Sequence, residues 1–168
     1  MSTSVTTSQT GDGYVESLRV EREEFRRVVN DQLSQAEDVE QTSAKLSRFV
    51  LVIMGVIASG VGIFPQQFPL NAGIVLGTGL LLVSFVLGVS VQQYPDMRAG
   101  VAARHANSLT ERELGERQWL ERLLGDYKAW VRWNEVELDN LSTLFAYAQN
   151  AFILGVVVTG VSLGVALL

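Results

Sequence analysis

Three uncharged apolar runs constrain this chain most: residues 49–64, 71–93 and 150–168 contain no Asp, Glu, Lys, Arg or His. Helices buried inside soluble proteins rarely exceed about 14 residues without a charge. Three such helices in 168 residues would also leave little polar surface to cover them. The runs therefore predict an integral membrane protein, with the lipid bilayer as its first partner.

The lengths of these runs set the boundaries of the predicted spans. A hydrocarbon core of about 30 Å takes roughly 20 helical residues. The first run is shorter, but neighbouring residues complete it if Lys45 and Arg48 extend towards the headgroups. We expect a transmembrane hairpin over residues 46–93 and a third transmembrane helix over residues 149–168.

Basic residues predict the orientation of the spans. Six of the thirteen Lys and Arg residues precede the first span, and seven lie between the second and the third. The turn at residues 65–70 contains none. Because basic loops remain in the cytoplasm, we expect the N-terminus in the cytoplasm and the C-terminus outside. A C-terminal reporter that is active only in the cytoplasm would contradict this orientation.

Two segments outside the spans are expected to be helical. Residues 1–13 are rich in Ser, Thr and Gly and predict a disordered tail. Residues 14–48 and 94–148 each contain an apolar stripe at helical spacing, which predicts two amphipathic cytoplasmic helices that pair antiparallel. A capping box at Thr110 and Glu113 would start the second. The expected fold is all-α, with three transmembrane and two cytoplasmic helices.

Small residues recur in all three spans and predict close helix packing, within one chain or between copies in a homo-oligomer. The residues singled out are Gly73, Gly77, Gly88, Gly160 and Gly164.

Polar side chains in the spans leave two alternatives open. They could line a pore, or they could pack into helix contacts or cap a helix, as Asn150 would at the cytoplasmic mouth of the third span. The candidate pore-lining residues are Ser59, Thr78, Ser84, Ser90, Asn150, Thr159 and Ser162.

The tryptophans offer a candidate partner surface. Trp119, Trp130 and Trp133 all lie in the second cytoplasmic segment. They could dock a cytoplasmic protein, or they could pack against the N-terminal helix and the membrane interface.

Catalytic chemistry has little basis in this sequence. There is one histidine, His105, and no cysteine, so we expect no metal site, no cofactor and no enzyme. The Gly-rich stretches lie inside the spans and not in phosphate-binding loops. The net charge of −5 argues against binding of nucleic acid.

The order of the segments resembles a known class of membrane proteins. Ala44-Lys45 before the first span, and residues 138–150 leading into the last, are similar to features of the SLATT-type and Pycsar-type membrane effectors of prokaryotic anti-phage systems. The order here is Ala-Lys and not Lys-Ala, and the likeness covers residues 40–168. It implies an oligomer that permeabilises or depolarises the membrane on a signal. The alternative is a non-conducting membrane scaffold whose cytoplasmic helices recruit a partner.

Overall fold

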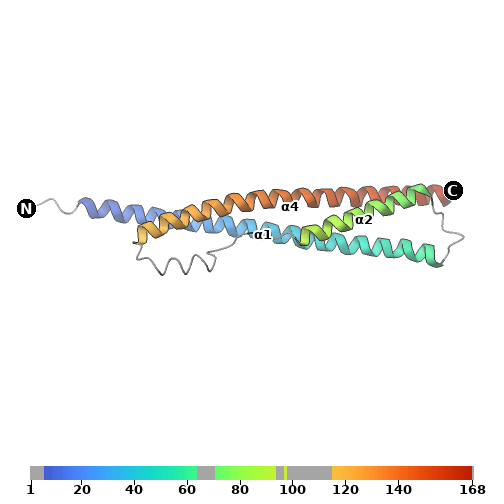
Figure 1. Cartoon of the computed structure of the whole chain (residues 1–168), viewed down its shortest axis with the longest axis horizontal. Coiled ribbons are helices and arrows are strands. Elements are labelled where there is room, and N and C mark those ends of the chain that lie inside the picture. Colours follow the sequence, from blue (N-terminus) through green and yellow to red (C-terminus); the bar gives the residue numbers. More distant parts are fainter. Residues whose placement is uncertain (1–5, 64–70, 94–96, 98–114, 168) are drawn as a thin grey trace, which may run out of the picture. The chain divides into compact units, whose positions relative to one another are not determined.

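The structure, a computed structural model, describes residues 6–63, 71–93, 97 and 115–167. This part of the chain contains three α-helices and no strand: α1 (Thr6–Ile63), α2 (Ala72–Gln92) and α4 (Glu116–Leu167) (Figure 1). Each is long and apolar enough to cross a membrane. The chain is therefore all-α with three candidate membrane-spanning helices, which indicates a multi-pass integral membrane protein.

Two of the helices are longer than any single span. α1 has 58 residues and α4 has 52, so each joins an amphipathic segment and an apolar run in one continuous helix. α1 already begins at Thr6 and includes residues 6–13, where the composition predicts a disordered tail. Once a helix is nucleated, each added residue gains one hydrogen bond, which favours extension into this stretch. The predicted capping box at Thr110 lies outside the described residues.

The chain divides into two compact units, each described here by itself. We call Met1–Gln35 with Asp96–Leu138 the charged unit, and Ala36–Pro95 with Asp139–Leu168 the membrane unit. α1 and α4 contribute to both units, and α2 belongs to the membrane unit alone.

A leucine cluster holds the charged unit together. Leu18 of α1 packs against Leu120 and Leu124 of α4, and all three are buried. Val15, Phe25 and Trp119 are partly buried around them. These residues come from the two apolar stripes, so each stripe buries against the other.

The two helices of the charged unit run parallel. Tyr14 and Arg19 contact Glu121 and Glu116, whereas Gln32, further along α1, donates a hydrogen bond to the carbonyl of Val131. From the Tyr14–Arg19 end of α1 to Gln32, the partners on α4 move from residues 116–121 to residue 131, so the two helices run in the same direction and the expected antiparallel pairing is wrong. The physical reason is topological. α2 returns the chain, so α1 and α4 run in the same direction (Figure 1).

In the membrane unit, α2 lies antiparallel to α4. Asn71 donates to the carbonyl of Ser162 at 3.3 Å, and Ser84 donates to the carbonyl of Ala148 at 2.8 Å. Asn71 also caps α2, because its Oδ1 accepts a hydrogen bond from the backbone nitrogen of Ile74 at 2.9 Å. One side chain thus starts the helix and ties it to α4.

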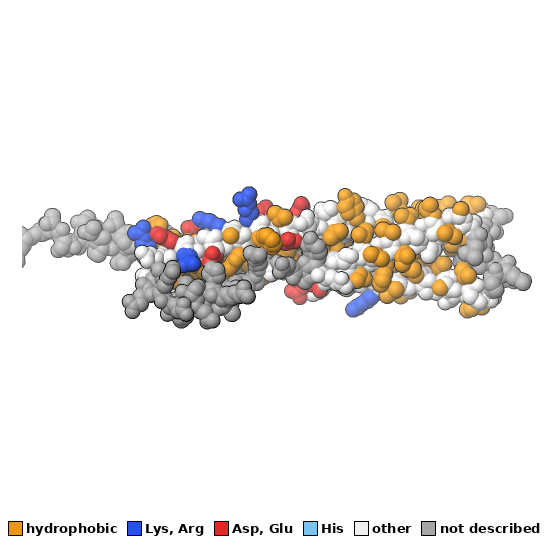
Figure 2. Space-filling model, viewed as in Figure 1, with side chains coloured by type: hydrophobic (Ala, Val, Ile, Leu, Met, Phe, Trp, Pro, Cys, Tyr) orange, Lys and Arg blue, Asp and Glu red, His pale blue; other side chains and the backbone are white. Residues whose placement is uncertain are grey.

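The outer surface of the membrane unit is apolar. Large hydrophobic side chains are exposed on every helix, including Phe49 on α1, Val75 on α2 and Val157 on α4. Figure 2 shows hydrophobic side chains over much of this unit, and its exposed charges, Lys45 and Arg48 among them, belong to the parts of α1 and α4 that precede their apolar runs. Such a surface suits lipid, because hydrocarbon tails solvate it without loss.

Candidate functional site

The closest helix contact in the membrane unit lies between α2 and α4, at glycines. A Cβ atom added at Gly77 would lie 2.9 Å from the backbone nitrogen of Thr159 and 3.0 Å from the carbonyl oxygen of Gly155. A Cβ at Gly73 would overlap the side chain of Ser162. Both glycines therefore let two backbones approach more closely than any other residue allows.

A second contact joins α1 to α2. Ser43 donates a hydrogen bond to the carbonyl of Gly88 at 2.9 Å, and Gln92 donates to Ser47 Oγ at 3.3 Å. A Cβ at Gly88 would lie only 2.6 Å from Ser47 Oγ. Gly88 thus leaves room for the serine side chains of α1, whereas the nearest α1 backbone atom, the Ser43 carbonyl oxygen, would lie 3.8 Å from the added Cβ.

The other two glycines singled out in the sequence lie elsewhere. Gly160 and Gly164 are exposed, and a Cβ at either would meet no described atom within 4 Å. Among the described residues nothing packs at these two positions, so they are open to a neighbouring helix.

The candidate pore-lining hydroxyls are largely engaged within this chain. Ser84 and Thr159 are buried between α2 and α4. Ser59 and Ser90 each donate to a carbonyl four residues back in their own helix. Thr78 and Ser162 are half-buried. Of these candidate residues, Thr159 has a side-chain oxygen that is buried without a hydrogen-bond partner among the described residues.

Asn150 and its neighbour Gln149 are different, because both side chains are exposed. Ala148, which accepts the hydrogen bond from Ser84, lies beside the middle of α2. Asn150 therefore lies level with the middle of α2 and not with its end, where the sequence places the cytoplasmic mouth. The uncharged stretch of α4 begins at Asn140, so a span matched to α2 starts well before residue 149.

Ion pairs and rings join the two helices of the charged unit. Arg19 pairs with Glu116, and Lys128 pairs with Glu21 at 3.1 Å. The Arg117 guanidinium lies 4.7 Å from the centre of the Tyr14 ring. These groups are exposed, so each contributes little alone and the leucine cluster dominates.

Two ion pairs of the charged unit shift pKa values: Arg19 with Glu116 between the helices, and Arg117 with Glu121 within α4. A hydrogen bond from Arg117 holds the pKa of Glu121 below its ordinary value, and a hydrogen bond to Glu121 raises the pKa of Arg117. A hydrogen bond to Glu116 likewise raises the pKa of Arg19.

We expect Glu121 to make the charged unit sensitive to acid. Because its pKa is lowered on folding, its contribution is present above the ordinary value of 4.5 and is lost as the pH falls through the lowered value. Thermal unfolding followed between about pH 5 and pH 3 should show a smaller acid loss in Glu121→Gln than in the wild type. Glu135→Gln, a matched substitution at an exposed carboxylate further along α4, should behave like the wild type. Equal acid sensitivity in Glu121→Gln would contradict this role.

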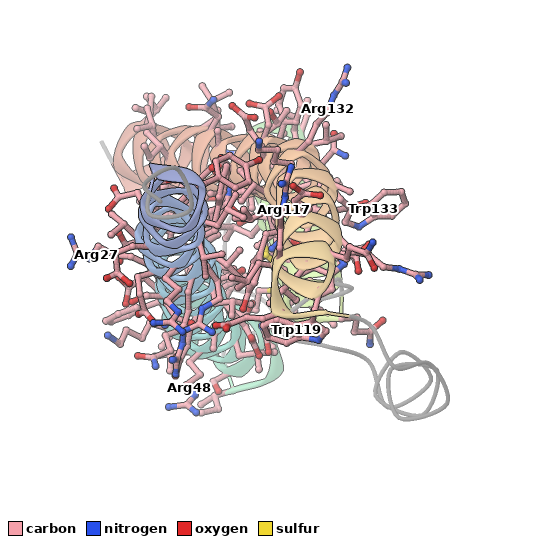
Figure 3. The ribbon with its side chains drawn as sticks, turned by 90° about the vertical axis from the view of Figure 1, so that its left-hand side faces the viewer. Arg27, Arg48, Arg117, Trp119, Arg132 and Trp133 are labelled. Carbon is pink, nitrogen blue, oxygen red and sulfur yellow. The ribbon has the colours of Figure 1, made fainter. Side chains whose placement is uncertain are left out.

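The three tryptophans have three environments. Trp119 packs against the leucine cluster, and Trp130 is half-buried with its ring edge-on to Tyr127 at 5.1 Å. Trp133 is 41% exposed and points outward from α4, on the side away from α1 (Figure 3). The tryptophans therefore do not form one surface, and only Trp133 is exposed.

A hollow of about 650 Å³ surrounds Trp133. Glu137 lines it, and its Oε2 is buried without a hydrogen-bond partner among the described residues. Exposed aliphatic surface comes from Val136. The other described lining residues are Lys128, Ala129 and Arg132. An aromatic ring, an aliphatic side chain and an unpaired carboxylate oxygen together suit protein binding better than catalysis.

Metal chemistry finds no support in the described residues, where no three His, Cys, Asp or Glu side chains lie close enough to hold an ion. His105 lies outside them.

Comparison with known proteins does not assign this chain to a family. No family model, curated protein or solved structure matches this chain. The contacts above are therefore the basis for the function proposed below.

Sequence reasoning missed two groups that the packing uses. The sequence analysis gives no packing role to Ser43 and Ser47, and it does not include Gly155 among the glycines expected at helix contacts. The spacing of four between the serines was the available signal, since it puts both on one helix face.

Proposed function

We propose that this protein is a membrane scaffold, in which three spans anchor a parallel two-helix unit that recruits a partner protein in the cytoplasm. The hollow at Trp133 is the observation that carries this proposal. The partner would place an apolar side chain on Trp133 and Val136 and a hydrogen-bond donor near Glu137. Such a donor would supply the interaction that the buried Glu137 oxygen lacks.

The placement of the hydroxyl groups also supports a scaffold. A water-filled pore needs polar side chains that face a lumen. Ser84 and Ser43 instead donate hydrogen bonds across helix contacts inside the membrane unit. Thr159 is buried against Gly77. These groups stabilise helix packing and are not available to water.

An oligomeric pore is the second candidate, favoured by the exposed amides of Gln149 and Asn150 level with the middle of α2. The resemblance to small membrane effectors implies the same activity. In such a pore these amides would line the lumen between copies.

Ion flux through liposomes that contain the purified protein separates the two candidates. We expect ion release no faster than from protein-free liposomes, because a scaffold leaves the bilayer intact. Sustained release that depends on the protein would contradict the scaffold and favour the pore.

Site-specific photocrosslinking in intact cells tests the hollow itself. Benzoylphenylalanine in place of Trp133 should give one discrete adduct with another protein, and adding Glu137→Ala should lower its yield severalfold. The control position is Arg27, exposed on the opposite side of the charged unit (Figure 3). The same adducts from both positions, or no adduct at residue 133, would contradict the proposal.

A further inference from the structure

α4 has two opposite faces within the membrane unit. The inner face carries Leu141, Ala148, Gly155 and Thr159, which are all buried. The outer face follows a spacing of three and four residues, and every member of it is exposed: Thr143, Ala146, Asn150, Ile153, Val157, Gly160 and Gly164. We call these seven residues the outer seam. At 100° per residue they fall within a stripe about 100° wide, on the side of the helix opposite the inner face.

The register against α2 gives the depth of Asn150 in the outer seam. The 21 residues of α2 extend about 31 Å, which matches the thickness of one hydrocarbon core. Asn150 follows Ala148, the residue bonded to Ser84 within one turn of the midpoint of α2. When α2 crosses the bilayer, the Asn150 carboxamide therefore lies near the bilayer centre.

A carboxamide at this depth needs a partner. It has two N–H donors and a carbonyl acceptor, and neither water nor lipid tails can bond to them there. No described residue of the chain forms a hydrogen bond with the Asn150 carboxamide. The partner must come from another molecule within the bilayer.

A second copy of this chain is the molecule that fits. All copies insert with the same orientation, so their α4 helices are parallel and their Asn150 side chains lie at the same depth. One amide donates while the other accepts. Gly160 and Gly164 give no steric barrier to a facing helix, because a Cβ at either would meet no described atom within 4 Å.

We infer that α4 self-associates in parallel through the outer seam, with Asn150 of two copies hydrogen-bonded at the centre. A single Asn in a seam of three-and-four spacing also fixes the register of the pair. This interface does not depend on the proposed function, because both a scaffold and a pore could use it.

Cysteine crosslinking in membranes tests the geometry, since the natural chain has no cysteine. Val157→Cys lies in the outer seam and should give disulfide-linked dimers under mild oxidation. Val75→Cys is the matched control, because Val75 is similarly exposed on α2 and lies within a turn of Gly77, which contacts Thr159. Equal crosslinking at both positions, or none at Val157→Cys, would overturn the interface.

Substitution of Asn150 tests the hydrogen bond. Single-molecule counting of labelled protein in dilute vesicles should show dimers that dissociate about tenfold more readily in Asn150→Leu, the usual size of one such bond in a membrane. Ser59→Ala removes an exposed hydroxyl on α1 that already donates to Gly55 in its own helix, and it should leave the dimer unchanged. An unchanged dimer in Asn150→Leu would overturn the role of Asn150. Flux and photocrosslinking report on the proposed function separately.

Discussion

Replacing Gly77 with alanine should lower the free energy of unfolding by about 1–3 kcal/mol, the usual range for adding a methyl group to a tightly packed site. The added Cβ would lie 2.9 Å from the Thr159 nitrogen and 3.0 Å from the Gly155 oxygen. Both are backbone atoms of a helix and cannot rotate away, so α2 and α4 must separate. Thermal unfolding of the purified protein in detergent, followed by circular dichroism, measures the loss.

Gly79→Ala is the matched control for this experiment. Gly79 lies in the same helix, but a Cβ there would meet no described atom within 4 Å. Alanine also has the higher helix propensity, so this variant should be at least as stable as the wild type. Equal melting temperatures for the two variants would show that α2 and α4 do not meet at Gly77.

Replacing Leu120 with alanine should destabilise the charged unit by about 2–5 kcal/mol, the range observed for removing a buried leucine side chain. Leu120 is 1% exposed and packs in the leucine cluster with Leu18 and Leu124. The surrounding ion pairs are exposed and cannot replace this burial. Amide hydrogen exchange of residues 14–35 should become much faster in this variant, since α1 loses its main partner there.

Val20→Ala controls for the removal of aliphatic groups in general. Val20 is 64% exposed and lies two residues from Leu18 in α1, so its truncation should leave exchange rates nearly unchanged. Slow exchange that persists in Leu120→Ala would mean that α1 is protected by something other than α4.

Composition predicted the number of spans. The direction in which α1 and α4 pair was predicted wrongly, and the register between α2 and α4 was not predicted. Uncharged runs identified three candidate spans because charges are costly in lipid. The parallel pairing of Leu18 with Leu120 could also have been deduced, since two intervening spans reverse the chain twice. The antiparallel expectation treated the two stripes as neighbours and ignored the membrane between them.

Register is less accessible from one sequence. Nothing in the run around Asn150 shows that Ser84 bonds to Ala148, and this bond is what moves Asn150 from the end of a span to its middle. Gly77 and Gly160 likewise both fit small-residue patterns that predict helix packing, so the sequence alone does not distinguish them. Only the positions of the neighbouring helices separate a glycine packed inside the chain from one exposed on its surface.

The parallel pairing also sets the order in which the protein can be completed during synthesis. Contacts in the charged unit join residues 107, 97 and 99 positions apart. At about 5–20 residues per second, the first helix waits roughly 5–20 s for its partner to be translated. During that interval the hairpin can already insert, while Leu18 and its neighbours remain uncovered. Closure of the charged unit is therefore a late step, which can follow only after the hairpin between its two helices has been translated.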